Sequence, residues 1–181
     1  MLVRHGEKEP DAGPPPYGVN EAGEVDKHSL IVRGWERAGA LVPFFRRPWV
    51  RGIETPEAVY ASMVGDQALI ADGHDISKSL RPQQTVTPLC RALALKDGLQ
   101  TPYPVGEESQ LVQSVIDSES GVVLIAWEHN HIPLIAQAFA AQAPPQWPDK
   151  CFDAVWILSK SGDKYEFHEV RQGLLDGDDG G

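Results

Sequence analysis

The chain has 181 residues, of which 41% are hydrophobic and 23% charged, and its net charge is −10 at pH 7. This composition is typical of one soluble globular domain, and no apolar run approaches the roughly 20 residues of a membrane-spanning helix. The negative charge argues against broad binding to nucleic acid, whereas small anions can still bind where cations cluster. We expect one domain over residues 1–175 and a disordered acidic tail over 176–181.

The two cysteines, Cys90 and Cys151, lack the spacing of metal ligands. We interpret them as core thiols in a reducing compartment, with a disulfide between them as the alternative. The first residues have the character of domain interior rather than of a secretory signal. We therefore expect a cytoplasmic protein.

Residues 2–7, Leu-Val-Arg-His-Gly-Glu, predict a short buried strand with a reactive end. Gly6 permits a sharp turn after the strand, and the planar guanidinium of Arg4 suits a phosphoryl group. His5 offers a nitrogen nucleophile that is largely neutral near pH 7. The alternative is an ordinary strand end that carries these three residues without a function.

The next segment, residues 7–29, is polar and interrupted by prolines and glycines, which predicts a loop. This loop forms either the rim of a pocket at the strand end or a solvated connector. Residues 30–46 have apolar side chains at helical spacing and predict a helix. Gly34 and Gly39 are poor helix formers, so they suggest that another element approaches this helix closely.

Residues 57–62 predict a short strand, residues 63–79 an irregular stretch, and residues 81–95 a second helix. Pro82 suits the first turn of that helix. A helix N-terminus attracts anions, so Arg81 stands where a second phosphate-binding cation is useful. The alternative is a solvent-exposed arginine.

A continuous apolar run at residues 121–127 predicts a strand buried on both faces, as in a parallel sheet. It is followed at once by Glu128, His129, Asn130 and His131, so a second strand ends in a histidine. The remaining predicted elements are a brief strand (99–105), a helix (107–118), a helix (132–142) and two late strands (154–159 and 165–170) joined by a turn at 161–163.

Strands alternate with helices over most of the chain, which predicts a three-layer α/β/α sandwich with a mainly parallel central sheet. Ligands of such sheets bind beyond the carboxyl ends of the strands. His5 and His129 both follow strands, and Arg4 and Arg81 stand close to strand ends in the sequence. We expect these side chains to form an anion pocket that contains a nucleophile.

Four segments, in order over about residues 1–160, resemble motifs of the histidine phosphatase superfamily, also called phosphoglycerate mutase-like. The resemblance implies that superfamily's sandwich fold and its phosphoryl chemistry. The segments are Leu2-Val-Arg-His-Gly-Glu7, Arg33-Gly-Trp-Glu-Arg-Ala38, Ser79-Leu-Arg-Pro-Gln-Gln-Thr85 and Val123-Leu-Ile-Ala-Trp-Glu-His-Asn130.

The resemblance also implies roles for single residues. His5 takes the phosphoryl group to form a phosphohistidine, which water then hydrolyses. Arg4, Arg81 and His129 surround the phosphoryl oxygens and stabilise their charge. Gly6 and Asn130 adjoin these residues as further substrate-binding positions. Neither a metal nor another cofactor is implied.

Two departures from the superfamily affect the site. Glu128 stands where a glycine is usual, and its carboxylate either favours the cationic form of His129 or points away from the pocket. Asn130 occupies the place of an acidic proton donor. We therefore expect Glu107 to be the donor, with Glu108 and then Asp97 as alternatives, although acidic residues are common in a helix's first turn for dipole reasons alone.

Taken with the resemblance, the sequence predicts a metal-independent phosphomonoester hydrolase. The alternatives are a mutase of the same chemistry and a non-catalytic, regulatory phosphate-binding module. The expected partner is a small phosphorylated substrate or a phosphate ion, with neither nucleic acid nor membrane, and the oligomeric state stays open. We expect four further histidines to face solvent: His28, His74, His131 and His168.

Overall fold

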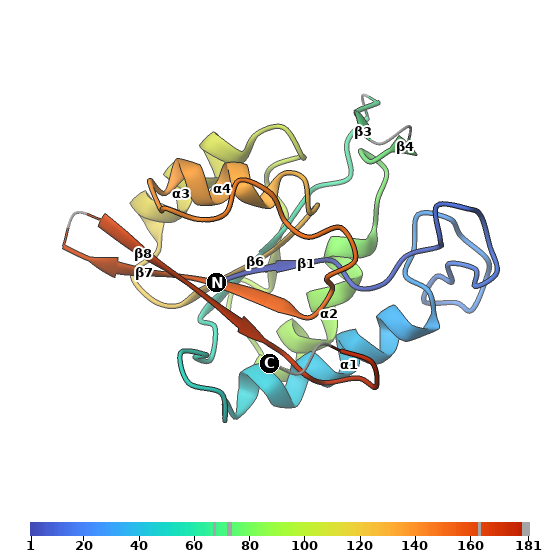
Figure 1. Ribbon diagram of the computed structural model, residues 1–181, viewed down its shortest axis with the longest axis horizontal. Coiled ribbons are helices and arrows are strands. Elements are labelled where there is room, and N and C mark those ends of the chain that lie inside the picture. Colours follow the sequence, from blue (N-terminus) through green and yellow to red (C-terminus); the bar gives the residue numbers. More distant parts are fainter. Residues whose placement is uncertain (67, 72–73, 163, 179–181) are drawn as a thin grey trace.

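The computed structural model describes residues 1–181 except 67, 72–73, 163 and 179–181, and it leaves the side chains of Ala71 and His74 undescribed. A six-stranded sheet forms its centre (Figure 1). In chain order, the strands of this sheet are β1 (Leu2–Arg4), β2 (Ala58–Ala61), β5 (Leu99–Gln100), β6 (Val123–Trp127), β7 (Ala154–Ser161) and β8 (Lys164–Arg171). Across the sheet the strands follow the order β5-β2-β6-β1-β7-β8.

The sheet is mixed rather than mainly parallel. Four adjacent strands run parallel to one another: β5, β2, β6 and β1. The next strand, β7, pairs antiparallel with both β1 and β8. The pairing of β7 with β8 follows from the short connection between them, where Ser161 pairs with Lys164. Strands joined by so few residues can pair only antiparallel, since a parallel pair needs a long crossover. The expected α/β class is confirmed, and the mainly parallel sheet applies to four of the six strands.

Helices cover both faces of the sheet (Figure 1). Neighbouring residues of one strand point to opposite faces, and in β6 Leu124 packs toward α1 and α2 while Ile125 packs toward α3 and α4. This double burial explains why the β6 sequence is continuously apolar. The helices are α1 (Val32–Arg46), α2 (Arg81–Leu93), α3 (Glu108–Ser118) and α4 (Ile132–Ala138).

The register of β1 and β6 sets the position of the candidate site. Arg4 is paired with Trp127, and the backbone N–H of His5 donates to the Trp127 carbonyl at 3.2 Å. Both strands stop here and run in the same direction. The residues that follow, His5 and Glu128, therefore leave the sheet at the same edge.

Two segments differ from their expected form. The stretch 63–79 contains a small antiparallel ribbon of β3 (Ile70–Ala71) and β4 (His74–Asp75), which two-residue strands make hard to detect in a sequence. The helix expected over 132–142 ends at Ala138, and Ala140 has a left-handed φ of 55°. That conformation is incompatible with a continuing right-handed helix.

The C-terminal segment contacts α1 as far as the structure describes it. Asp178 is bonded to the buried guanidinium of Arg37 at 2.6 Å and accepts backbone N–H groups of Leu174 and Leu175. Residues 176–178 of the expected disordered tail are thus bonded to the domain, and residues 179–181 lie outside the described part. In the described residues, no helix combines the length and apolar character that a membrane span requires.

Candidate active site

A cavity of about 300 Å³ lies at the edge of the sheet where β1 and β6 end. Its inner part is lined by His5, Glu128 and His129, which follow these strands, and by Arg81, the first residue of α2. The expected convergence of two histidines and Arg81 is therefore present. The two histidines come to the same edge because β1 and β6 are parallel and end at the same level in the sheet.

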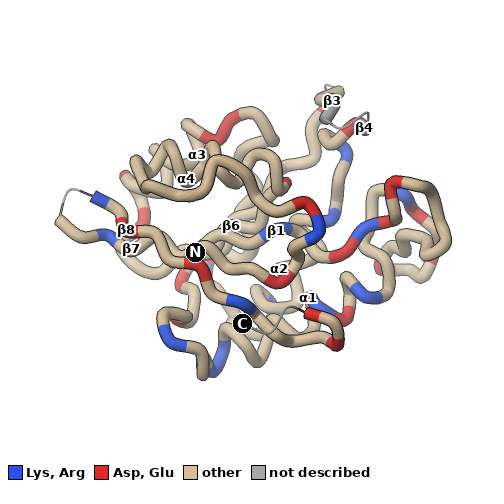
Figure 2. The backbone as a smooth tube through the Cα atoms, in the orientation of Figure 1, with Lys and Arg blue, Asp and Glu red and all other residues tan. Residues whose placement is uncertain are grey.

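The mouth of the cavity carries charges of both signs. Lys8, Glu9 and Asp11 come from the start of the segment after β1, and Lys27 and His28 from its end. Figure 2 shows acidic and basic residues along this segment. The segment over 7–29 thus forms a pocket rim, one of the two outcomes expected from its sequence.

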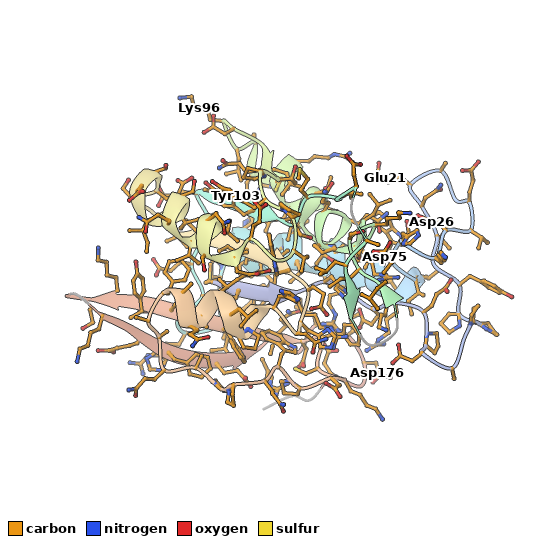
Figure 3. The ribbon with its side chains drawn as sticks, turned by 90° about the horizontal axis from the view of Figure 1, so that it is seen from above. Glu21, Asp26, Asp75, Lys96, Tyr103 and Asp176 are labelled. Atoms are coloured by element: carbon orange, nitrogen blue, oxygen red, sulfur yellow. The ribbon has the colours of Figure 1, made fainter. Side chains whose placement is uncertain are left out.

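The β3–β4 ribbon forms the other side of the mouth. Asp75 of β4 lines the cavity, and Figure 3 shows it beside Asp26 of the segment after β1. Both carboxylates are close enough to His28 to act on its charge. His28 itself is half-buried and lines the cavity, so it is not the plain surface residue expected from the sequence.

His5 is buried, with 3% of its surface exposed. Its Nδ1 lies 2.7 Å from the carbonyl oxygen of Gly6, which can only accept a hydrogen bond. Nδ1 therefore carries the proton, and Nε2 keeps the lone pair in the neutral ring. Burial, followed by the positive charges of Arg4 and Arg81, lowers the pKa of His5 well below 6.5, so this neutral form persists at physiological pH.

Two glycines let the end of β1 lie against α1. A Cβ on Gly34 would lie 2.6 Å from the backbone oxygen of Glu7, and a Cβ on Gly6 would lie 3.0 Å from the backbone oxygen of Gly34. The backbone N–H of Gly6 also donates to Thr85 Oγ1 at 2.8 Å, which ties the strand end to α2. The close approach expected at Gly34 is therefore present, and its partner is the residue pair that follows His5.

Glu7 is fixed by the same helix. It accepts hydrogen bonds from Arg37 at 2.7 Å and from Arg33 at 3.2 Å, and Arg37 is 1% exposed. The two arginines of the Arg33–Ala38 motif thus hold the chain just beyond His5. They do not line the cavity.

Arg81 is held in place by backbone oxygens of the facing loop. Its Nε donates to the Ser29 carbonyl at 3.3 Å, and Nη2 donates to the Lys27 carbonyl. Burial lowers the pKa of Arg81, but an arginine with a lowered pKa of this kind still carries its charge near neutral pH. The solvent-exposed alternative is excluded, since Arg81 lines the cavity beside His5.

Arg4 lies behind the cavity lining rather than in it. Its guanidinium donates to the Asp149 carbonyl and stacks on Phe152 at 4.0 Å from the ring centroid. Burial lowers the pKa of Arg4 to about 10, so it is cationic at pH 7. Its Nε is buried and makes no hydrogen bond within the described residues, which leaves one donor unsatisfied.

Glu128 lines the cavity and does not point away from it. Its Oε2 accepts the backbone N–H of Asn130 at 2.8 Å, and its Oε1 lies 2.5 Å from Nδ1 of His129. That contact has the distance of an ion pair but not the alignment of a hydrogen bond. Glu128 and His129 are both more than nine-tenths buried.

The acids expected to donate the proton lie elsewhere. Glu107 stands at the start of α3, is half-buried and does not line the cavity, and Asp97 is exposed and also outside it. Glu108 is buried and accepts hydrogen bonds from Trp127 Nε1 at 2.9 Å and from the Gly106 N–H at 2.8 Å.

His131 is the third partner of Glu108, at 2.9 Å, and its side chain is only 19% exposed. The expectation that His131 faces solvent is therefore wrong. Burial is the largest single effect and disfavours both charges, but it is outweighed for Glu108 by its hydrogen bonds to His131, Gly106 and Trp127 together, so the pKa of Glu108 is lowered. For His131, the hydrogen bond to Glu108 and the negative charges of Glu108 and Glu128 together outweigh burial, so its pKa is raised. His168 is exposed on β8 as expected, and the His74 side chain is outside the described part.

Several lining residues had no signal in the sequence. Glu9 and Lys27 lie in a Pro- and Gly-rich segment, where residue spacing carries no information about the direction of a side chain.

Of the described residues, no group of three or more His, Cys, Asp or Glu side chains is arranged to hold a metal ion. Cys90 and Cys151 are both buried free thiols.

Comparison with known proteins gives no assignment. No family model matches the sequence, and no curated protein is significantly similar to it.

Proposed function

We propose that this protein is a phosphomonoester hydrolase that acts without a metal through a phosphohistidine at His5. The observation that carries the proposal is the state of His5: a buried neutral imidazole with its proton on Nδ1, beside two arginines. A nitrogen nucleophile of this kind needs no base to activate it. The proposal includes a phosphoglycerate mutase-like arrangement of the three layers.

In the first step, the Nε2 lone pair of His5 forms a bond to phosphorus while the ester P–O bond breaks. Arg81 and His129 line the cavity and contact the equatorial oxygens, where the negative charge of the transition state is spread. Arg4 contributes its positive charge from behind the cavity lining. In the second step, water attacks phosphorus and the P–N bond returns its electrons to Nε2.

The test is hydrolysis of para-nitrophenyl phosphate with and without a chelator. We expect turnover that the chelator leaves unchanged and a phosphoenzyme that is stable to alkali and labile to acid. His5→Ala should abolish both, while His168→Ala, the same change at an exposed position on β8, should retain both. Unchanged turnover in His5→Ala would remove His5 from this role.

A non-catalytic module is the second candidate, since the expected acid Glu107 lies outside the cavity. Calorimetric titration with inorganic phosphate separates the two. Binding that His5→Ala and Arg81→Ala weaken, without turnover of any phosphomonoester tested, supports the module. A mutase differs from both by transferring the phosphoryl group between two positions of a small phosphorylated acceptor.

A further inference from the structure

The proposed hydrolysis needs a group that protonates the leaving oxygen, and the cavity contains four carboxylates that stand near enough to be considered. These are Glu9, Asp11, Asp75 and Glu128. Their hydrogen bonds distinguish them. An effective donor needs one oxygen fixed by the protein and the other oxygen open to the substrate.

Three of the four are committed elsewhere. Asp75 accepts the Ser77 hydroxyl at 2.6 Å and two backbone N–H groups, all on Oδ1, and the hydrogen bond from the Ser77 hydroxyl, followed by those from the N–H groups, lowers its pKa and so disfavours the protonated form that a donor needs. Asp11 is 77% exposed and forms an ion pair with Lys8. Glu128 has one oxygen on the Asn130 N–H and the other beside His129.

Glu9 has the required arrangement. Its Oε1 accepts the backbone N–H of Gly18 at 2.8 Å, and in the described part of the chain no hydrogen bond occupies Oε2. The residue is half-buried, so the carboxyl group is partly removed from water. Glu9 and Arg81 line the same cavity, and among the acidic residues Glu9 has the strongest electrostatic effect on Arg81, whose guanidinium is proposed to hold the phosphoryl group.

Gly18 places this carboxyl group relative to Arg81. A Cβ on Gly18 would lie 2.3 Å from the Asp26 oxygen and 2.8 Å from the Ser29 oxygen, so the two parts of the loop touch at this residue. The Ser29 carbonyl in turn accepts Nε of Arg81. Gly18, which binds Glu9, and Ser29, which binds Arg81, are therefore in close contact with each other.

We propose that Glu9 is the general acid and base of the reaction. This inference depends on the proposed hydrolysis at His5. In the first step, the proton on Oε2 of Glu9 passes to the leaving oxygen as the P–O bond breaks, which leaves a carboxylate. In the second step, that carboxylate takes a proton from the attacking water as the new P–O bond forms and the P–N bond breaks. Both protons are thus accounted for without a further reactant.

The experiment compares Glu9→Gln with the wild-type protein on two substrates. We expect hydrolysis of an alkyl phosphate to fall roughly 10²- to 10⁴-fold, the usual contribution of a general acid. The first step with para-nitrophenyl phosphate should change little, because para-nitrophenolate leaves without a proton. A burst of para-nitrophenol and accumulated phosphohistidine should follow, since the second step has lost its base.

Glu36→Gln makes the same change on an exposed face of α1 and should behave as the wild type on both substrates. Equal slowing of both substrates in Glu9→Gln, or a leaving-group effect in Glu128→Gln instead, would overturn the proposal. Wild-type protein without any turnover would refute the hydrolase function itself, which is a separate result.

Discussion

The Nδ1 proton of His5 is donated to the carbonyl oxygen of its own neighbour, Gly6, over 2.7 Å. One short backbone turn therefore selects the tautomer of the ring. It leaves Nε2 as the nucleophilic atom before any substrate arrives. The same turn depends on Gly34, because a side chain there would meet the backbone of Glu7.

The first prediction concerns the pH dependence of His5. Its pKa in the folded protein is well below the unfolded value of 6.5, so the acidic limb of kcat/KM due to this residue should lie below pH 6.5. Because the unfolded chain binds the proton more readily, His5 also makes the protein less stable as the pH falls through 6.5. Denaturant titrations at pH 7.5 and 5.5 should show a smaller loss of unfolding free energy in His5→Gln. An equal loss in both proteins contradicts the lowered pKa.

The second prediction concerns Arg81. Arg81→Ala should reduce turnover about 10²- to 10³-fold, the usual effect of removing one preorganised charged donor. Arg81→Lys should recover only part of this, since an ammonium group cannot reproduce a fork already held by two backbone carbonyls. Steady-state kinetics measure both. Arg91→Ala, in the exposed last turn of the same helix, is the matched control, and full activity of Arg81→Lys would argue against the fork.

The third prediction compares Glu107 with its neighbour. Glu108→Ala leaves Trp127 Nε1 and the Gly106 N–H without their acceptor, so the unfolding free energy should fall by about 1–3 kcal/mol. Glu107→Ala should stay within about 0.5 kcal/mol of the wild type. Glu107→Gln should also show no selective loss on the alkyl phosphate. A strong selective loss would restore Glu107 as the proton donor and displace Glu9.

The fourth prediction uses two glycines of one helix. Gly34→Ala places a Cβ 2.6 Å from the Glu7 oxygen, an overpacked contact that should cost about 1–3 kcal/mol in unfolding free energy. Gly39→Ala meets no atom within 4 Å and should instead stabilise α1 by about 0.5–1 kcal/mol. Thermal or chemical denaturation measures both changes. Destabilisation by both variants would show that helix propensity is not the deciding factor.

The residues at the ends of β1 and β6 could be predicted from the sequence, because an apolar run of residues marks each strand and the point where it ends. An apolar run such as β6 can be recognised without knowledge of its neighbours, and parallel strands bring their ends to one edge. His5, Arg81 and His129 therefore converge as expected.

The acids of the site were not predictable in the same way. Glu9 is placed by a contact between its carboxylate and Gly18, nine residues later in an irregular loop, and no periodicity encodes such a contact. Glu107 and Glu108 are adjacent at the start of α3, and a difference of one position on a helix changes the direction of the side chain. Glu108 is therefore buried. Likewise, the antiparallel pairing of β7 with β8 depends on the length of one turn rather than on the composition of either strand.

The place of β1 within the sheet has a consequence for how the protein is made. Its neighbours are β6 and β7, so Leu2 pairs with Ile125 on one side and with Trp156 on the other. Such long-range pairs form late, because the intervening chain must first exist and then close into a loop. β1 is synthesised before both strands that flank it and is therefore fixed only after them, and a chain interrupted before Ala154 lacks one of the two strands that position His5.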